Sequence, residues 1–92
     1  MRLEDALFNW LQIRIVADAR PEDGAARSTL EFFEEILRED HGLTDVAVAA
    51  VDAATIQVRY IQEGRSELQL FDREAGEQLL LDIEANPKYN GT

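Results

Sequence analysis

The chain of 92 residues contains no cysteine, two prolines and a single histidine. Without cysteine the protein forms no disulfide, and it has no thiolate nucleophile or cysteine-ligated metal centre. The longest uninterrupted apolar run has six residues, Val46 to Val51, whereas a membrane span needs roughly 20. Acidic residues follow the first methionine at Glu4 and Asp5, where a signal peptide would have an apolar core. These absences predict a cytoplasmic protein without a membrane anchor.

Basic residues are scarce: nine lysines and arginines stand against nineteen acidic residues, for a net charge of −10. The excess is spread along the chain, with −6 over residues 1–45 and −4 over residues 46–92. Phosphate backbones and anionic membranes attract lysine and arginine, so we expect neither nucleic acid nor membrane as a partner. Hydrophobic residues make up 46% of the chain, which predicts one globular domain over residues 1–92.

Helical spacing dominates the first half of the chain. Leucine or isoleucine recurs every four residues from Leu3 to Ile15, which predicts a helix over residues 3–19. The alternative is a strand over residues 11–17, where apolar residues also alternate. The apolar stripe is wide, so this helix is expected to contact more than one neighbour.

A second helix is predicted over residues 21–40. Pro21 suits its first turn, and Glu22 and Asp23 place negative charge near its N-terminus. Gly42 suits the left-handed conformation that ends many helices.

After Gly42 the apolar period changes from helical to two, which predicts four strands over residues 46–51, 55–62, 67–72 and 78–84. We expect each strand to pair antiparallel with the next across a short loop. All the resulting facing pairs are apolar: Val48–Val58, Val46–Tyr60, Tyr60–Leu68, Val58–Leu70, Leu70–Leu79 and Leu68–Leu81.

The alternative for residues 74–85 is a helix, because Ala75, Leu79 and Ile83 are four residues apart. A glycine at position 76 would cost such a helix about 1 kcal/mol relative to alanine. A strand explains Gly76 as the end of a tight turn, so the strand is preferred. Residues 85–92 are expected to be irregular.

The predicted fold class is therefore α+β, with two N-terminal helices packed on one face of a four-stranded antiparallel β-meander (ααββββ). In this register the open side of the sheet also carries apolar residues, and we interpret them as an interface. They are Val51, Ile61, Phe71 and Leu80. The alternative is that the first helix or the C-terminal tail covers that side.

No constellation of residues points to catalysis. His41 is the only imidazole and is expected at a helix C-terminus, where the helix dipole favours its positive form. No serine near it has a nucleophile pattern, and the five glycines form no phosphate-binding loop. We therefore expect no catalytic residue, no cofactor and no bound metal, and consider an enzyme the less favoured class.

Three functional hypotheses follow. The leading one is a non-catalytic binding or regulatory module that acts as a homo-oligomer, most simply a dimer, through the open sheet face or the first helix. The first alternative is an acidic protein that binds and inhibits a basic partner protein through the second helix, at Glu31, Glu34, Glu35 and Glu39. The second alternative is a small ligand-binding domain or enzyme with a pocket between helices and sheet, rimmed by Trp10, Arg14 or Tyr60.

Overall fold

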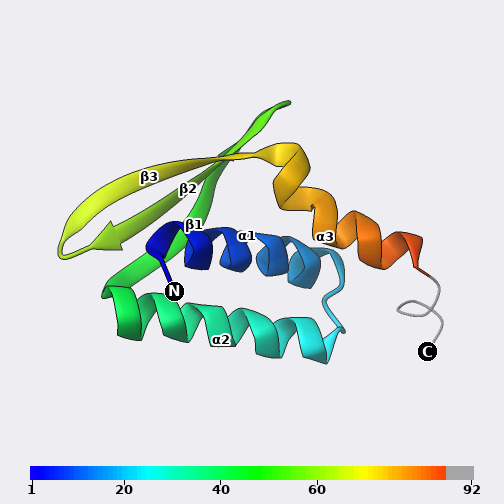
Figure 1. The fold of residues 1–92 in the computed structure, drawn as a ribbon, viewed down its shortest axis with the longest axis horizontal. Helices are drawn as coiled ribbons and strands as arrows, with labels where there is room; N and C mark the ends of the chain where they lie inside the picture. Colours follow the sequence, from blue (N-terminus) through cyan, green and yellow to red (C-terminus); the bar gives the residue numbers. More distant parts are fainter. Residues whose placement is uncertain (87–92) are drawn as a thin grey trace.

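The computed structural model describes residues 1–86 and has the predicted α+β class with an antiparallel sheet. Two N-terminal helices precede a three-stranded meander of order β1-β2-β3, and a third helix follows it (Figure 1). The elements are α1 (Leu3–Ala19), α2 (Gly24–His41), β1 (Leu43–Val51), β2 (Thr55–Gln62), β3 (Arg65–Asp72) and α3 (Arg73–Ala85). Residues 87–92, most of the expected irregular tail, lie outside the described part of the chain. None of the described helices is long and apolar enough to cross a bilayer.

Helix α1 has the predicted bounds, and the alternative strand over residues 11–17 is wrong. The helix lies between α2 and the sheet, and α3 runs beside it (Figure 1). Such a position buries a helix on several sides, which accounts for its wide apolar stripe. Its buried residues are Ala6, Leu7, Trp10, Leu11, Ile13 and Val16.

Helix α2 begins three residues later than predicted, because its N-cap is Asp23 and Pro21 lies before the helix instead of in its first turn. The Asp23 carboxylate accepts a hydrogen bond from the backbone N–H of Ala26 at 3.0 Å, which satisfies one of the free donors of the first turn. The predicted C-terminus is confirmed. Gly42 has a φ of +69°, and its N–H donates to the carbonyl of Arg38 at 3.1 Å.

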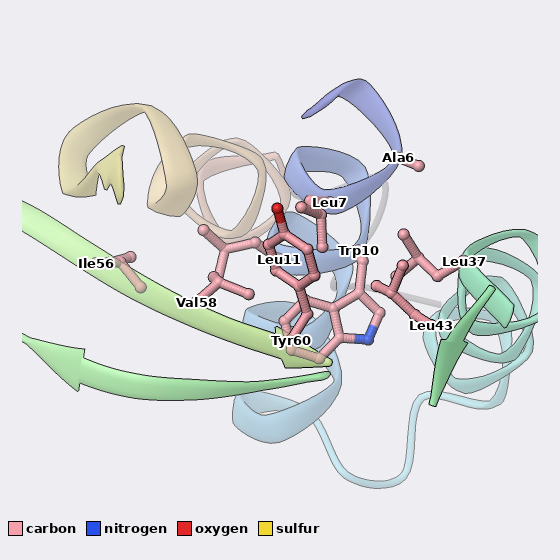
Figure 2. Packing of buried hydrophobic residues seen from close by; sticks show 9 residues of the cluster. All are labelled: Ala6, Leu7, Trp10, Leu11, Leu37, Leu43, Ile56, Val58 and Tyr60. Carbon is pink, nitrogen blue, oxygen red and sulfur yellow. The ribbon is translucent and has the colours of Figure 1, made fainter. Parts of the chain in front are cut away.

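The main core lies between α1, the sheet and the end of α2 (Figure 2). Trp10, Leu7 and Leu11 of α1 are fully buried there, and Ile56, Val58 and Tyr60 of β2 pack against them. A second cluster joins the C-terminal half of α1 to α2 and α3 around Ile13 and Val16. The two clusters together fix both outer helices on α1.

The predicted fourth strand, residues 78–84, is wrong: these residues belong to α3. Asp72 caps this helix by accepting a hydrogen bond from the N–H of Ala75 at 2.9 Å. Two further contacts at helical spacing support it, Arg73–Glu77 at 3.1 Å and Gln78–Asp82 at 2.8 Å. Such pairs at i and i+4 are neighbours only in a helix.

Gly76 is buried where α3 crosses the core. A Cβ at this position would lie 3.3 Å from Cδ1 of Ile56 and 3.4 Å from Cδ2 of Leu11. The glycine therefore allows α3 to approach α1 and β2 closely. Packing across this contact offsets the low helix propensity of glycine. Gly76 therefore lies inside a helix and not, as predicted, at the end of a turn.

The register predicted for the first hairpin is confirmed, since Val46 pairs with Tyr60 and Val48 with Val58. The register predicted for the second hairpin is wrong by one residue, because Tyr60 pairs with Glu67 and not with Leu68. The predicted loop had three residues, whereas the observed loop has two, Glu63 and Gly64, with φ values of 52° and 78°. Positive φ at both central residues is typical of the two-residue type I′ hairpin.

This single-residue difference moves every side chain of β3 to the opposite side of the sheet. Leu68 and Leu70 therefore face away from the helices, and Phe71 pairs with Ile56 on the covered side. A β-bulge between Val48 and Ala50 has the same effect on the end of β1.

Candidate interaction surface on the open sheet face

One side of the sheet faces the helices and the other faces away from them (Figure 1). Ile56, Val58 and Tyr60 are buried on the covered side, so the alternate residues of β2 project from the other side. Cross-strand partners share a side, which places residues of β1 and β3 beside them. We call this surface the open face. Its residues are Asp45, Ala47, Ala50, Gln57, Arg59, Ile61, Ser66, Leu68 and Leu70.

Two leucines dominate the open face. Leu68 and Leu70 are each 58% exposed, and they project side by side because they are two residues apart on β3. Apart from Met1, no large hydrophobic residue in the described part of the chain is more exposed. Adjacent exposed leucines on a sheet are a stronger sign of an interaction surface than single scattered ones.

The β1 side of the open face has short side chains, because two of its three residues there are alanines. Ala47 pairs with Arg59, and Ala50 pairs with Gln57. A hollow of about 260 Å³ lies at this side, lined by Asp45, Ala47, Val48, Ala49, Arg59, Tyr60 and Ile61. The open face is thus raised along β3 and hollowed along β1.

The nine residues of the open face carry one charge of each sign, Arg59 and Asp45; Asp72 lies on the same side at the edge of the sheet, where it pairs with Thr55 and caps α3. Neither Arg59 nor Asp45 forms an ion pair with another residue of the described chain. The whole chain has a net charge of −10, so this surface is close to neutral on a strongly acidic molecule. Two copies can bring neutral surfaces together more easily than acidic ones.

Of the four residues predicted on this side, the structure places only Ile61 there. The β-bulge pairs Val51 with Ile56, so Val51 is on the helix side although it is 53% exposed. Phe71 packs against Phe8 of α1, with ring centroids 5.6 Å apart. Leu80 belongs to α3 and packs on the second core cluster.

Leu68 and Leu70 were not among the predicted interface residues. The signal that identifies them is the dipeptide Glu63-Gly64, since a two-residue hairpin turn fixes the register that exposes them.

Three of the four acidic residues predicted to bind a basic partner are exposed on the second helix. Glu31, Glu35 and Glu39 are exposed on α2, but Glu34 is half-buried. The carboxylate of Glu34 accepts a hydrogen bond from Nε1 of Trp10 at 3.3 Å. Glu34 therefore connects α2 to α1 and does not belong to the exposed acidic surface.

An exposed aromatic ring lies among these acidic residues. Phe32 is 56% exposed and contacts the ring of Phe33 edge-on at 5.3 Å. A shallow hollow of about 210 Å³ beside it is lined by Phe32, Glu35, Ile36, Glu39 and Asp40. We call this surface the acidic face of α2.

The residues expected at the rim of a ligand pocket are placed elsewhere. Trp10 is fully buried and Tyr60 is 8% exposed, both within the main core. Arg14 is paired with Asp18 on the surface of α1 at 3.1 Å. A groove of about 410 Å³ does lie between the three helices, lined mainly by Ile13, Val16, Ala26, Leu79 and Ile83.

His41 is the last residue of α2, as expected. Its Nε2 atom is buried without a hydrogen-bond partner within residues 1–86, and its carbonyl accepts from the amide of Gln62 at 2.8 Å. Over the same residues, no three acidic or imidazole side chains are grouped to hold a metal ion.

Among the titratable groups of residues 1–86, three have shifted pKa values, each with a local structural cause. Backbone N–H donors lower the pKa of Asp52, at Ala54 and Thr55, and that of Asp23, at Ala26. Burial raises the pKa of Tyr60. All three groups act in caps, turns or the core, and none lies on the open face.

Comparison of the chain with protein-family models, curated proteins and solved structures finds no match in any of the three.

Proposed function

We propose that this protein is a small non-catalytic binding module that acts as a homodimer through the open face of its sheet. The observation that carries this proposal is the adjacent pair Leu68 and Leu70 on the open face, each 58% exposed. A regulatory role would follow from the dimer's weak association, because a change in concentration would then change the assembly.

The leucines supply a driving force for association. Full burial of a leucine side chain contributes about 1.5–3 kcal/mol. More than half of each leucine is exposed here, so covering it contributes about 1–2 kcal/mol.

The size of the open face indicates a modest affinity. Strand rise and spacing give a footprint of about 26 Å by 14 Å for three strands of this length. That is below the roughly 800 Å² per partner of standard stable interfaces. We therefore expect dissociation in the micromolar range.

Sedimentation equilibrium of matched variants tests this proposal. The unmodified chain should approach twice its mass of 10.4 kDa as its concentration rises toward about 200 µM, well above a micromolar dissociation constant. The variant L68E/L70E should remain a monomer, because it buries four carboxylates in the interface. The control F32E/L81E adds the same charge at residues that are 56% and 52% exposed on α2 and α3, and it should still dimerise.

A monomeric unmodified chain over that whole range would overturn the proposal. So would an L68E/L70E variant that dimerises as well as the control. Far-ultraviolet circular dichroism confirms that each variant is folded, which is expected because both leucines project into solvent.

The acidic face of α2 supports a second candidate function, binding to a basic partner protein. Phe32 offers an exposed apolar contact, and Glu35, Glu39 and Asp40 surround the hollow beside it. A segment that combines lysine or arginine with an apolar residue would complement both features.

A synthetic leucine–lysine amphipathic peptide is the probe for this second function. Calorimetric titration should show binding that weakens from about 50 mM to 300 mM salt, because surface charges are screened. E35Q/E39Q should weaken it further, whereas the control E22Q/E74Q, which removes the same charge elsewhere, should change it less. Equal effects of the two variants would show that only the overall charge matters, and would contradict a site on α2.

A further inference from the structure

We infer that two copies pack their open faces together about a two-fold axis parallel to β2, so that Leu68 of each copy fills the hollow beside Ala47 of the other copy and Leu70 lies over Ala50. This inference rests on the proposed homodimer and specifies its geometry. It identifies the partner as a second copy of this chain, because the open face is complementary to itself.

The raised and hollowed parts of the open face follow from the residues that are paired across its three strands, which we call rows. One row across the sheet is Ala47–Arg59–Leu68, and the next is Ala50–Gln57–Leu70. Each row begins with the smallest apolar side chain on β1 and ends with a large one on β3. The hollow of about 260 Å³ lies at the alanine side, and the exposed leucines lie at the other.

Symmetry then distinguishes two ways of stacking the faces. A two-fold axis across the strands places β3 over β3 and β1 over β1, so that leucines meet leucines and the hollows stay empty. An axis parallel to β2 places β3 of each copy over β1 of the other. Leu68 then lies over Ala47 and enters the hollow of the second copy, and Leu70 lies over Ala50. Close packing favours the second arrangement.

The same axis also brings opposite charges together. Asp45 lies one row from Arg59 along the sheet, since it pairs with Ile61. Across the interface, Asp45 of the second copy is offset from Arg59 by about 8 Å in the plane of the sheets. The two side chains together can span that offset. The pairing is reciprocal, as an isologous interface requires, and it offsets the repulsion between the two Arg59 side chains near the axis.

The Asp45 carboxylate also lies over Ser66 of the second copy, because Ile61 pairs with Ser66 in the same row. A hydroxyl can donate to a carboxylate, so the polar ends of the rows are satisfied as well. Asp45, Ala47 and Ala50 of one copy therefore lie opposite Ser66, Leu68 and Leu70 of the other.

Two substitutions test the arrangement because each weakens the dimer by a different route. A47L makes the surface more apolar but fills the hollow, so it should raise the dissociation constant about tenfold or more through overpacking. L68A should raise it by a similar factor through lost contact. Both positions project into solvent in the monomer, so both variants should fold.

The decisive experiment mixes the two variants. In a heterodimer of A47L with L68A, the new leucine lies over the new alanine, and the other contact is that of the unmodified chain. The mixture should therefore associate within about threefold of the unmodified chain, although each variant alone is at least about tenfold weaker. Sedimentation of one fluorescently labelled variant with the other measures this directly.

Other outcomes contradict the arrangement. If A47L leaves the affinity unchanged or increases it, or if the mixture is as weak as the separate variants, the two-fold axis is not parallel to β2. The homodimer itself would still stand if L68E/L70E is monomeric, so the two failures are distinguishable. Should A47L be unfolded by circular dichroism, A50L with L70A makes the same test one row away.

Discussion

Replacing Gly76 by valine tests the contact that fixes α3 on the core. Even a single Cβ at position 76 would lie 3.3 Å from Ile56 and 3.4 Å from Leu11. Those two side chains are 2% and 0% exposed, so they cannot move aside freely. The two further methyl groups of valine would overlap them.

The expected loss can be worked out from two effects. Overpacking a close-packed core costs about 1–3 kcal/mol. Replacing glycine by valine improves helix propensity by only a few tenths of a kcal/mol, because valine is itself a weak helix former. We therefore expect G76V to lower the free energy of unfolding by about 1–3 kcal/mol, equivalent to a fall in Tm of about 5–20 °C for a domain of this size.

The control for this variant is A75V, one residue earlier on the exposed side of α3. It carries the propensity cost of valine without the core contact, so it should lose only about 0.5 kcal/mol. Urea unfolding followed by Trp10 fluorescence measures both variants, because this single tryptophan is fully buried. The measurement is made at about 1 µM to keep the chain monomeric. A G76V variant as stable as A75V would refute the packing of α3 on Ile56 and Leu11.

Two further predictions concern the turns and caps. The pKa values of Asp23 and Asp52 are lowered in the folded chain, so folding favours their ionised forms. Their contribution to the free energy of unfolding is therefore fully present above the ordinary aspartate pKa of 3.8. It is lost as the pH falls through the lower pKa of the folded chain. Thermal melts from pH 6 to pH 2 should show this loss, and it should be smaller in D23N/D52N; an unchanged acid profile in that variant would contradict the assignment. Glu63 has a φ of 52° in the hairpin turn, so E63N should stabilise the fold by about 0.5–1 kcal/mol in urea unfolding, because asparagine tolerates this conformation better. A destabilised E63N variant would argue against the two-residue turn.

The N-terminal helices and β2 could be predicted from the sequence because their patterns are long. Leucine or isoleucine recurs at helical spacing through more than three turns from Leu3 to Ile15. That stretch is longer than most β-strands. The end of α2 at Gly42 could also be predicted, because a glycine after a helical run often adopts a positive φ.

The last element could not be predicted because short patterns are ambiguous. Leu79, Leu81 and Ile83 alternate as in a strand, whereas Ala75, Leu79 and Ile83 repeat as in a helix. The local helix signals are the Asp72 cap and the Arg73–Glu77 pair. The reason for Gly76 lies in its contact with two residues distant in sequence, which no local pattern contains.

Which residues form the candidate site depends on the exact length of one hairpin loop and on one β-bulge. A loop one residue shorter than expected exposes Leu68 and Leu70 and places Phe71, half-buried, against Phe8 of α1. A β-bulge returns Val51 to the helix side. Because side chains alternate along a strand, an error of one residue exchanges the buried and the exposed set completely.

The most direct test of the homodimer is sedimentation equilibrium of the unmodified chain from about 1 to 200 µM at two salt concentrations, a range that brackets a micromolar dissociation constant. Two copies with a net charge of −10 each repel one another at low salt, whereas the contact itself is apolar. We predict a reversible monomer–dimer equilibrium that tightens as salt rises from about 20 to 300 mM, because screening removes the repulsion. A mass that stays at 10.4 kDa throughout would contradict self-association through Leu68 and Leu70.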